Sequence, residues 1–132
     1  MPDPTSITQI DLTPISGKKY FSIDREWREE FIYFLMVDRF QDENVRPVAS
    51  GIGRTPGVDT PDAFYGGKIV GITNNLAYIA ELGCTAIWLS PIFENNNAYH
   101  GYDINNYLSI DPRFGTKQVL IDLVDSEERG IR

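Results

Sequence analysis

A run of polar and aromatic side chains from Phe93 to Asp103 holds the residue types in this sequence that are best suited to chemistry. Within it, Tyr99, Tyr102 and His100, the only histidine of the chain, stand among three asparagines and an aspartate. Flat apolar rings can cover the face of a sugar ring, and amides, hydroxyls and carboxylates can bond its hydroxyl groups. The run therefore predicts a carbohydrate site rather than a phosphate or lipid site.

The position of this run along the chain also favours a binding role. It follows a short apolar segment, Thr85–Leu89, that ends in Ser90-Pro91 and is typical of a buried strand. It precedes a helix that Thr116 can cap. A loop between a strand and a helix lies at the carboxyl end of the strand, where α/β sheets and barrels bind their ligands.

Composition excludes several classes of protein. The chain has 132 residues, 42% hydrophobic and 23% charged, so disorder over its whole length is not expected. Its net charge of −7 and its lack of a basic run argue against nucleic acid as a partner. No apolar run is long enough for a membrane span. Cys84 is the only cysteine, so we expect no intrachain disulfide, a buried role for Cys84, and a cytoplasmic protein without a signal peptide.

Hydrophobic periodicity predicts two strand–loop–helix units. Seven apolar residues in a row, Phe31–Val37, predict a strand buried on both faces, and Glu43–Asp62 reads as a long irregular loop. The next helix has Thr73 as its N-cap, Gly83 as its C-cap, and an apolar face of Ile72, Leu76, Ile79 and Ala80. The last helix, capped by Thr116 and ended by Gly130, has an inner face of Val119, Leu120, Leu123 and Val124.

The order of these elements predicts a parallel α/β architecture. Connections after the strands are long and polar, whereas those after the helices are short, as in a (β/α)8 TIM barrel. A complete barrel needs roughly 250 residues. We therefore expect the first two β/α repeats of such a barrel and, at Ile131-Arg132, the start of its third strand. Residues 1–25 form an extended lead-in, and residues 26–132 form the barrel fragment.

Five sequence pieces in this order resemble the amino-terminal part of the α-amylase family, glycoside hydrolase family 13. The resemblance covers about residues 27–132, and its order and spacing make it highly specific. The matching pieces are Ile32–Phe40, Phe64–Ile72, Leu82–Ile92, Tyr99–Asp103 and Ile110–Thr116.

This resemblance implies a retaining enzyme that acts on α-glucosidic bonds of an α-glucan or malto-oligosaccharide. Such enzymes use a nucleophile and an acid/base carboxylate about 5 Å apart. In the family these carboxylates follow later strands, so none is expected before Arg132, and the 132-residue chain alone is expected to be inactive. Bond type, hydrolysis or transfer, and attack at chain ends or internally stay open.

The resemblance also assigns substrate-binding roles on the Tyr99–Asp103 piece. Tyr102 matches the tyrosine that stacks on the sugar before the scissile bond, although a packed tyrosine is the alternative. His100 either donates to sugar hydroxyls or braces the loop. Asp103 either grips the hydroxyls of a chain end, or pairs an arginine, or caps a turn. Tyr99 is expected to pack.

Two further features concern an ion pair of Asp38 and a calcium loop at Asp42 and Asn44. Asp38, at the end of the first strand, is expected to support the barrel rim by an ion pair. Asp42 and Asn44 resemble the calcium loop of some relatives, since calcium prefers oxygen ligands. Lys68 stands where those relatives carry an aspartate, and its ammonium would repel the cation. We therefore expect no cofactor and no metal site, with calcium left as a possibility for a longer parent protein.

Asn95-Asn96-Asn97 is expected to be a solvated loop.

Two other classes of protein are considered. A non-catalytic relative could keep the barrel as a sugar-binding or interaction scaffold, and it would lack the three carboxylates after later strands. An unrelated phosphate-binding βαβ protein would need a glycine-rich turn that opens a helix. Gly66-Gly67 comes near this pattern, but no Lys-Ser or Lys-Thr pair follows.

Overall fold

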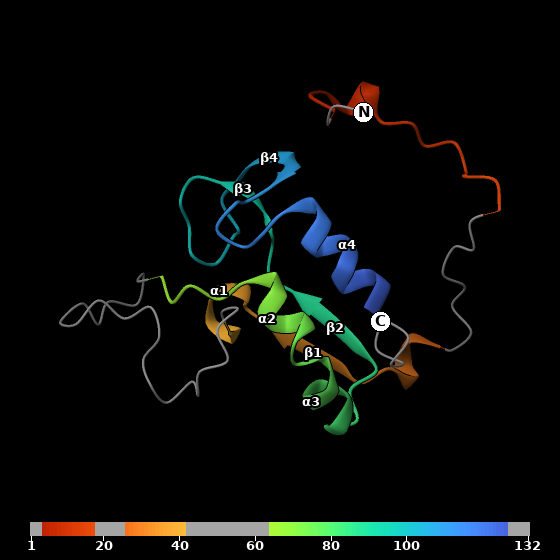
Figure 1. Ribbon diagram of the computed structural model, residues 1–132, viewed down its shortest axis with the longest axis vertical. Coiled ribbons are helices and arrows are strands. Elements are labelled where there is room, and N and C mark those ends of the chain that lie inside the picture. Colours follow the sequence, from red (N-terminus) through yellow and green to blue (C-terminus); the bar gives the residue numbers. More distant parts are fainter. Residues whose placement is uncertain (1–3, 18–25, 42–63, 127–132) are drawn as a thin grey trace.

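The computed structural model describes residues 4–17, 26–41 and 64–126, and all structural statements concern these residues (Figure 1). Short 3-10 turns, η1 and η2, occur at Ile7–Gln9 and Trp27–Glu29. The strands and helices follow in the order β1 (Ile32–Leu35), α1 (Val37–Phe40), α2 (Ile69–Thr73), α3 (Leu76–Glu81), β2 (Ala86–Leu89), β3 (Phe93–Asn95), β4 (Ile104–Ile110) and α4 (Lys117–Asp125). None of the helices in these ranges is long and apolar enough to cross a membrane.

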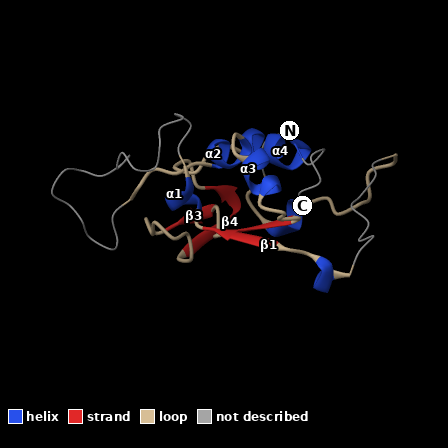
Figure 2. Cartoon of the chain, turned by 90° about the horizontal axis from the view of Figure 1, so that it is seen from below, coloured by secondary structure: helices blue, strands red, loops and turns tan. Residues whose placement is uncertain are grey.

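The β1 and β2 strands pair in parallel, as the sequence predicts. Their register places Ile32 beside Ala86 and Leu35 beside Leu89. Parallel strands need a crossover, which α2 and α3 provide. Figure 2 shows α2, α3 and α4 on one side of this pair. This is the strand–helix–strand unit from which parallel barrels are built.

The core lies between the strand pair and these helices. It contains a cluster of apolar side chains from β1, the four helices and the connections between elements: Leu35, Val37, Ile69, Ile72, Leu76, Ile79, Cys84, Ile92, Phe114 and Leu123. Cys84 is a buried free thiol in this cluster, which confirms its predicted packing role. The expected helix positions 72, 76 and 79 are fully or almost fully buried, so the periodic pattern identified the inner face correctly.

The prediction that Phe31–Val37 is a strand buried on both faces is wrong in two respects. The strand β1 is shorter, because Val37 already begins α1. One face is also open: Ile32 is 44% and Phe34 is 51% exposed, while Leu35 on the other face is buried. Only one face of β1 packs against helices, so its alternate side chains point away from the described core.

The helix predicted between the strands is interrupted. It forms two shorter helices, α2 and α3, that meet at Asn74-Asn75. Thr73 is therefore the last residue of α2 rather than an N-cap, and its hydroxyl donates to the carbonyl of Ile69. Asn75 explains the break, since its side-chain amide bonds the Gly71 carbonyl and the Gln41 side chain. Gly83 has a φ of +83° just after α3, as a glycine past a helix end should.

The α4 helix begins where the sequence predicts. The Thr116 hydroxyl accepts a hydrogen bond from the Val119 amide, which confirms the cap. Leu123 is buried on its inner face, but Val124 is 50% exposed and was wrongly placed there. The helix ends at Asp125. Three predicted features lie outside the described ranges: the helix end at Gly130, the third strand at Ile131-Arg132 and the loop Glu43–Asp62.

The segment after β2 is more ordered than a simple loop. Strands β3 and β4 form an antiparallel hairpin with an irregular register, beyond the carboxyl end of β2 (Figure 1). The sequence analysis missed both strands because it treated 93–116 as one connection. Tyr107 and the isoleucines at both ends of β4 are the strand-forming residues that could have indicated it.

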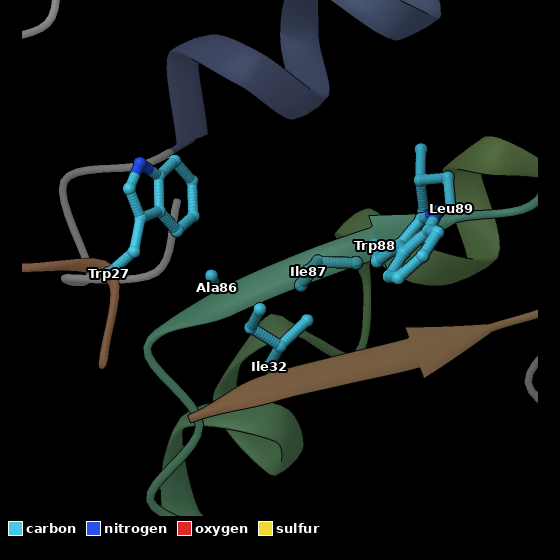
Figure 3. A pocket seen from close by; sticks show the side chains of 6 residues that line it. All are labelled: Trp27, Ile32, Ala86, Ile87, Trp88 and Leu89. Carbon is cyan, nitrogen blue, oxygen red and sulfur yellow. The ribbon is translucent and has the colours of Figure 1, made fainter. Parts of the chain in front are cut away.

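Among the described residues, the face of the β1–β2 pair away from the helices carries the exposed apolar side chains of Ile32, Phe34 and Trp88. A hollow of about 330 Å³ adjoins β2 and is lined by Trp27, Ile32 and the consecutive β2 residues Ala86, Ile87, Trp88 and Leu89, whose side chains Figure 3 shows. Trp88 is 61% exposed and meets Phe34 edge-on, with ring centroids 5.6 Å apart. In a parallel barrel, side chains on this face of neighbouring strands stack in interior layers.

Candidate carbohydrate-binding site

The carboxyl ends of β1 and β2 are joined by buried hydrogen bonds that form a firm base for the loops. The amide of Ser90 donates to the carbonyl of Leu35 at 2.9 Å, and its hydroxyl accepts from the amide of Val37 at 3.1 Å. Ser90 is only 1% exposed, so these bonds are shielded from water. The two loops therefore leave the strands from fixed positions.

Asp38 ties the chain after β1 to the glycine turn. Its carboxylate accepts from the amides of Tyr65 and Gly66 at about 3.1 Å and pairs with Arg39 at 3.3 Å. Asp38 is 3% exposed, and its contacts fit the predicted supporting role by an ion pair. Gly67 approaches so closely that a Cβ there would lie 2.0 Å from the Val37 carbonyl oxygen. Gly67 therefore serves close backbone packing, whereas Gly66, with a φ of +83° and nothing within 4 Å of a Cβ, supplies the left-handed turn before it.

Tyr102 and His100 lie together on the exposed tip of the β3–β4 loop. The amide of Tyr102 donates to Nδ1 of His100 at 3.0 Å, and the two ring centroids are 5.8 Å apart. Tyr102 is 58% exposed, so its ring is open to a ligand. Because Nδ1 accepts this bond, Nε2 of His100 carries the proton and can donate outward.

Gly101 allows the loop to turn between these two residues. It has a φ of +80°, and a Cβ there would lie 2.0 Å from the carbonyl oxygen of Pro91. Only glycine satisfies both conditions. The loop tip therefore folds back onto the end of the segment that follows β2.

Asp103 and Tyr99 occupy different positions on the loop. The Asp103 side chain is exposed, and its carbonyl accepts from the amide of Asn96, which closes the loop at its base. The Tyr99 ring packs against Arg39, whose guanidinium carbon lies 4.3 Å from the ring centroid and 4.0 Å from that of Tyr65. The expected packing role of Tyr99 agrees with this contact, whereas the roles of Tyr102, His100 and Asp103 towards sugar stay predictions.

Asn95 is not part of a solvated loop, so that expectation is wrong for it. It is 8% exposed, and its side chain donates to Asp111 at 2.9 Å and accepts from the amide of Ala98 at 2.7 Å. Arg113 completes the cluster, because its guanidinium bonds both Asn95 and Asp111. A buried carboxylate requires such partners, and Asn95 and Arg113 supply them for Asp111.

The pKa of Asp111 lies below its ordinary value. Burial raises the pKa of this carboxyl, but the hydrogen bonds and charge of Arg113, with a further bond from Asn95, outweigh burial and lower it. Asp111 is therefore ionised near neutral pH and holds Arg113 in place.

Asp111 and Arg113 belong to the Ile110–Thr116 piece of the sequence, but no role in the site was predicted for either. An arginine two residues after an aspartate, beyond a proline, can fold back on that carboxylate, as it does here. That short spacing was a usable signal. Their contact with Asn95 depends on the register of the missed hairpin, so the sequence alone could not indicate it.

The described residues do not favour the calcium site. No group of three or more His, Cys, Asp or Glu side chains within residues 4–17, 26–41 and 64–126 could hold a metal ion. Asp42 and Asn44 lie outside these ranges. The amide of Lys68 donates to the Gln41 carbonyl at 2.8 Å, so a cationic residue adjoins the chain just before Asp42. The absence of a calcium site at Asp42 and Asn44 therefore stays a prediction.

Fold and loop together define a class of protein. A parallel β1–helix–β2 unit with aromatic and polar loops after its strands is the beginning of a (β/α)8 enzyme barrel. The sequence matches the family described as alpha amylase, catalytic domain, over residues 34–132. The chain therefore belongs to the α-amylase family of glycoside hydrolases, which confirms the resemblance found in the sequence.

Curated relatives and solved structures agree with this assignment. Alpha-amylase 2 of Dictyoglomus thermophilum is 40% identical and spans 94% of this chain, and a cyclomaltodextrinase of Geobacillus thermopakistaniensis is 39% identical over 81% of it. The solved α-amylase of Geobacillus thermoleovorans complexed with acarbose is 40% identical, covers 83% of this chain and has a TM-score of 0.67. This chain spans only 22%, 18% and 22% of these three proteins. It is thus similar to a fragment of each, consistent with a partial barrel.

Proposed function

We propose that this chain is the amino-terminal, sugar-binding part of an α-glucan-active retaining glycoside hydrolase or transglycosidase. The observation that carries the proposal is the open ring of Tyr102 beside His100, held at the carboxyl end of β2. The ring offers an apolar face to a glucose unit, and Nε2 of His100 offers a donor to its hydroxyls. Asp103 supplies a carboxylate at the same tip.

The ligand class has a second line of support. Among the similar structures, one α-amylase is described as complexed with acarbose, and a cyclic maltosyl-maltose hydrolase of Arthrobacter globiformis is described as complexed with maltose. Carried over to this chain, these names favour malto-oligosaccharides as ligands. Bond type and the choice between hydrolysis and transfer are not assigned, because they depend on residues outside this chain.

Titration of the chain with maltotriose, followed by NMR, tests the proposal. We expect weak, saturable binding with shifts at the Tyr102 and His100 signals. Tyr102→Ala should raise the dissociation constant about tenfold, because the stacking surface is lost. Tyr102→Phe keeps the ring and should change it less than about threefold. Tyr107→Ala, which removes a similarly exposed ring elsewhere on the hairpin, is the matched control and should have no effect.

The same chain should bind without turnover. The carboxylates that the family uses for catalysis follow later strands than β2, so we expect no release of nitrophenol from a nitrophenyl maltoside. Turnover by the purified chain would contradict this part of the proposal. Equal loss of binding in the Tyr102→Ala and Tyr107→Ala variants would contradict the assigned position of the sugar.

A further inference from the structure

The loop that carries Tyr102 and His100 needs a device that holds it in one conformation. Loops are more mobile than the elements they connect, and a binding site loses affinity when its groups must be ordered by the ligand. The contacts around the base of this loop converge on one side chain, that of Arg113, which comes from the connection between β4 and α4.

The Arg113 guanidinium binds several points on the loop at once. Its Nη2 donates to the side-chain oxygen of Asn95 at 2.8 Å and to the carbonyl of Ala98 at 3.4 Å. Its Nη1 donates to the side-chain oxygen of Asn97 at 3.4 Å. The planar fork of arginine suits such a set, because its donors point in fixed directions. Asn97 has a φ of +66°, so this contact supports a backbone conformation that L-residues adopt rarely.

The guanidinium itself is firmly anchored. Its Nε donates to Asp111 at 2.9 Å, and Asp111 is 3% exposed. Its carbon lies 4.6 Å from the ring centroid of Phe64, directly before Tyr65 and the glycine turn held by Asp38. Arg113 therefore links the sugar loop to the rim segment that follows β1.

A second arginine, Arg39, also links the rim segment at Phe64-Tyr65 to the loop that carries His100 and Tyr102. Arg39 lies over the ring of Tyr65 and over that of Tyr99, which is the residue before His100. The consecutive rings of Phe64 and Tyr65 thus meet one arginine each. The loop is held at Asn95–Ala98 by Arg113 and at Tyr99 by Arg39, and the free tip begins at His100.

We propose that Arg113 is a positioning residue for carbohydrate binding: it fixes the segment Asn95–Ala98 and thereby pre-forms the Tyr102–His100 tip for a glucose ring. The inference rests on the proposed function, since the ligand is the same α-glucan. The guanidinium acts through the loop, because it bonds the loop residues Asn95, Asn97 and Ala98 while Asp111 and the Phe64 ring hold it in place.

The test compares Arg113→Lys in the full 132-residue chain with Arg28→Lys, a matched change at an arginine whose side chain is 80% exposed. Lysine keeps the charge and its attraction to Asp111 but loses the fork. Hydrogen exchange at the Asn96, Ala98 and Tyr102 amides should rise about tenfold in Arg113→Lys, and the dissociation constant for maltotriose should rise about fivefold. Exchange at the core amide of Ile79 should not change, and Arg28→Lys should match the wild type in every measurement.

Asn95→Ala provides a second variant in which the Arg113–Asp111 pair is kept. It removes the acceptor that serves both Arg113 and the Ala98 amide, so it should show the same local exchange and the same weaker binding. Unchanged loop exchange in both variants would overturn the positioning role. Faster exchange with unchanged maltotriose affinity would also overturn it.

The outcomes separate this inference from the function on which it rests. If the wild-type chain shows no saturable maltotriose binding, the proposed function fails, and the substrate role of Arg113 fails with it. If the wild type binds and both variants bind equally well, the proposed function stands and this inference alone is overturned.

Discussion

At the scale of single residues, the loop after β2 depends on positions where only one side chain fits. Gly101 combines a positive φ with a close approach to the Pro91 carbonyl. Gly83 also has a positive φ, +83°, but nothing lies within 4 Å of a Cβ built there. The two glycines therefore separate the cost of backbone strain from the cost of a collision.

Replacing each of these glycines by alanine measures the two costs. Gly83→Ala should lower the free energy of unfolding by about 1 kcal/mol, because an L-residue resists the left-handed conformation. Gly101→Ala should lower it by at least about 2 kcal/mol, since the loop must also move away from Pro91. Urea denaturation followed by fluorescence gives both values, and equal losses would show that the approach to Pro91 is loose in solution.

Residue identities explain why some parts of the site were predictable and others were not. Tyr102 and His100 were proposed from their types and their place after a strand, which local sequence reveals, and their roles towards sugar stay predictions. Asn95 was misread, because its burial depends on Asp111 and Arg113, which lie 16 and 18 positions away along the chain. A network of this kind forms only when the hairpin brings its two ends together.

At the scale of elements, the predictions were correct where apolar runs or a capping residue determine the structure. They were wrong where a side chain forms a contact with a distant part of the chain. Parallel pairing of β1 with β2 and the Thr116 cap of α4 follow from apolar runs and from capping chemistry. The break between α2 and α3 follows from Asn75, which bonds back to Gly71 and across to Gln41. Periodicity carries no information about such a tertiary contact.

Asp111 stabilises one end of the β3–β4 hairpin, because its carboxylate accepts hydrogen bonds from Asn95 of β3 and from Arg113 after β4. The pKa of Asp111 is lowered in the folded chain, so its contribution to the hairpin is complete above the unfolded value of about 3.8. The contribution is lost as the pH falls through the lower, folded pKa. Stability of the hairpin should therefore fall with decreasing pH in the acid range and stay level near neutrality.

NMR signals of the Asn95 side-chain amide measure this titration, because that amide donates to Asp111. In the wild type their midpoint should lie below 3.8, and in Asp111→Asn the acid transition should be absent. The variant should also start from a less stable hairpin, since the ion pair with Arg113 is gone. A midpoint at or above 3.8 in the wild type would contradict the argument.

At the scale of the whole molecule, helices cover one face of the β1–β2 pair, and no helix or strand in the described ranges covers the other (Figure 2). Phe34 and Trp88 are each more than half exposed there and meet edge-on, and Ile32 of β1 is 44% exposed. Apolar surface of this kind on a soluble chain promotes association. The net charge of −7 opposes association, but Ile32, Phe34 and Trp88 on this face carry no charge.

Trp88→Lys tests whether this face controls the state of the chain in solution. The wild type should associate as its concentration rises, because association removes the rings of Trp88 and Phe34 from water. The lysine places a charge in the centre of the face and should shift the chain towards the monomer in sedimentation velocity at the same concentration. Tyr78→Lys, at a 51% exposed position on α3, is the matched control on the helical side and should sediment as the wild type does. Equal shifts in both variants would mean that net charge, and not the open sheet face, governs association.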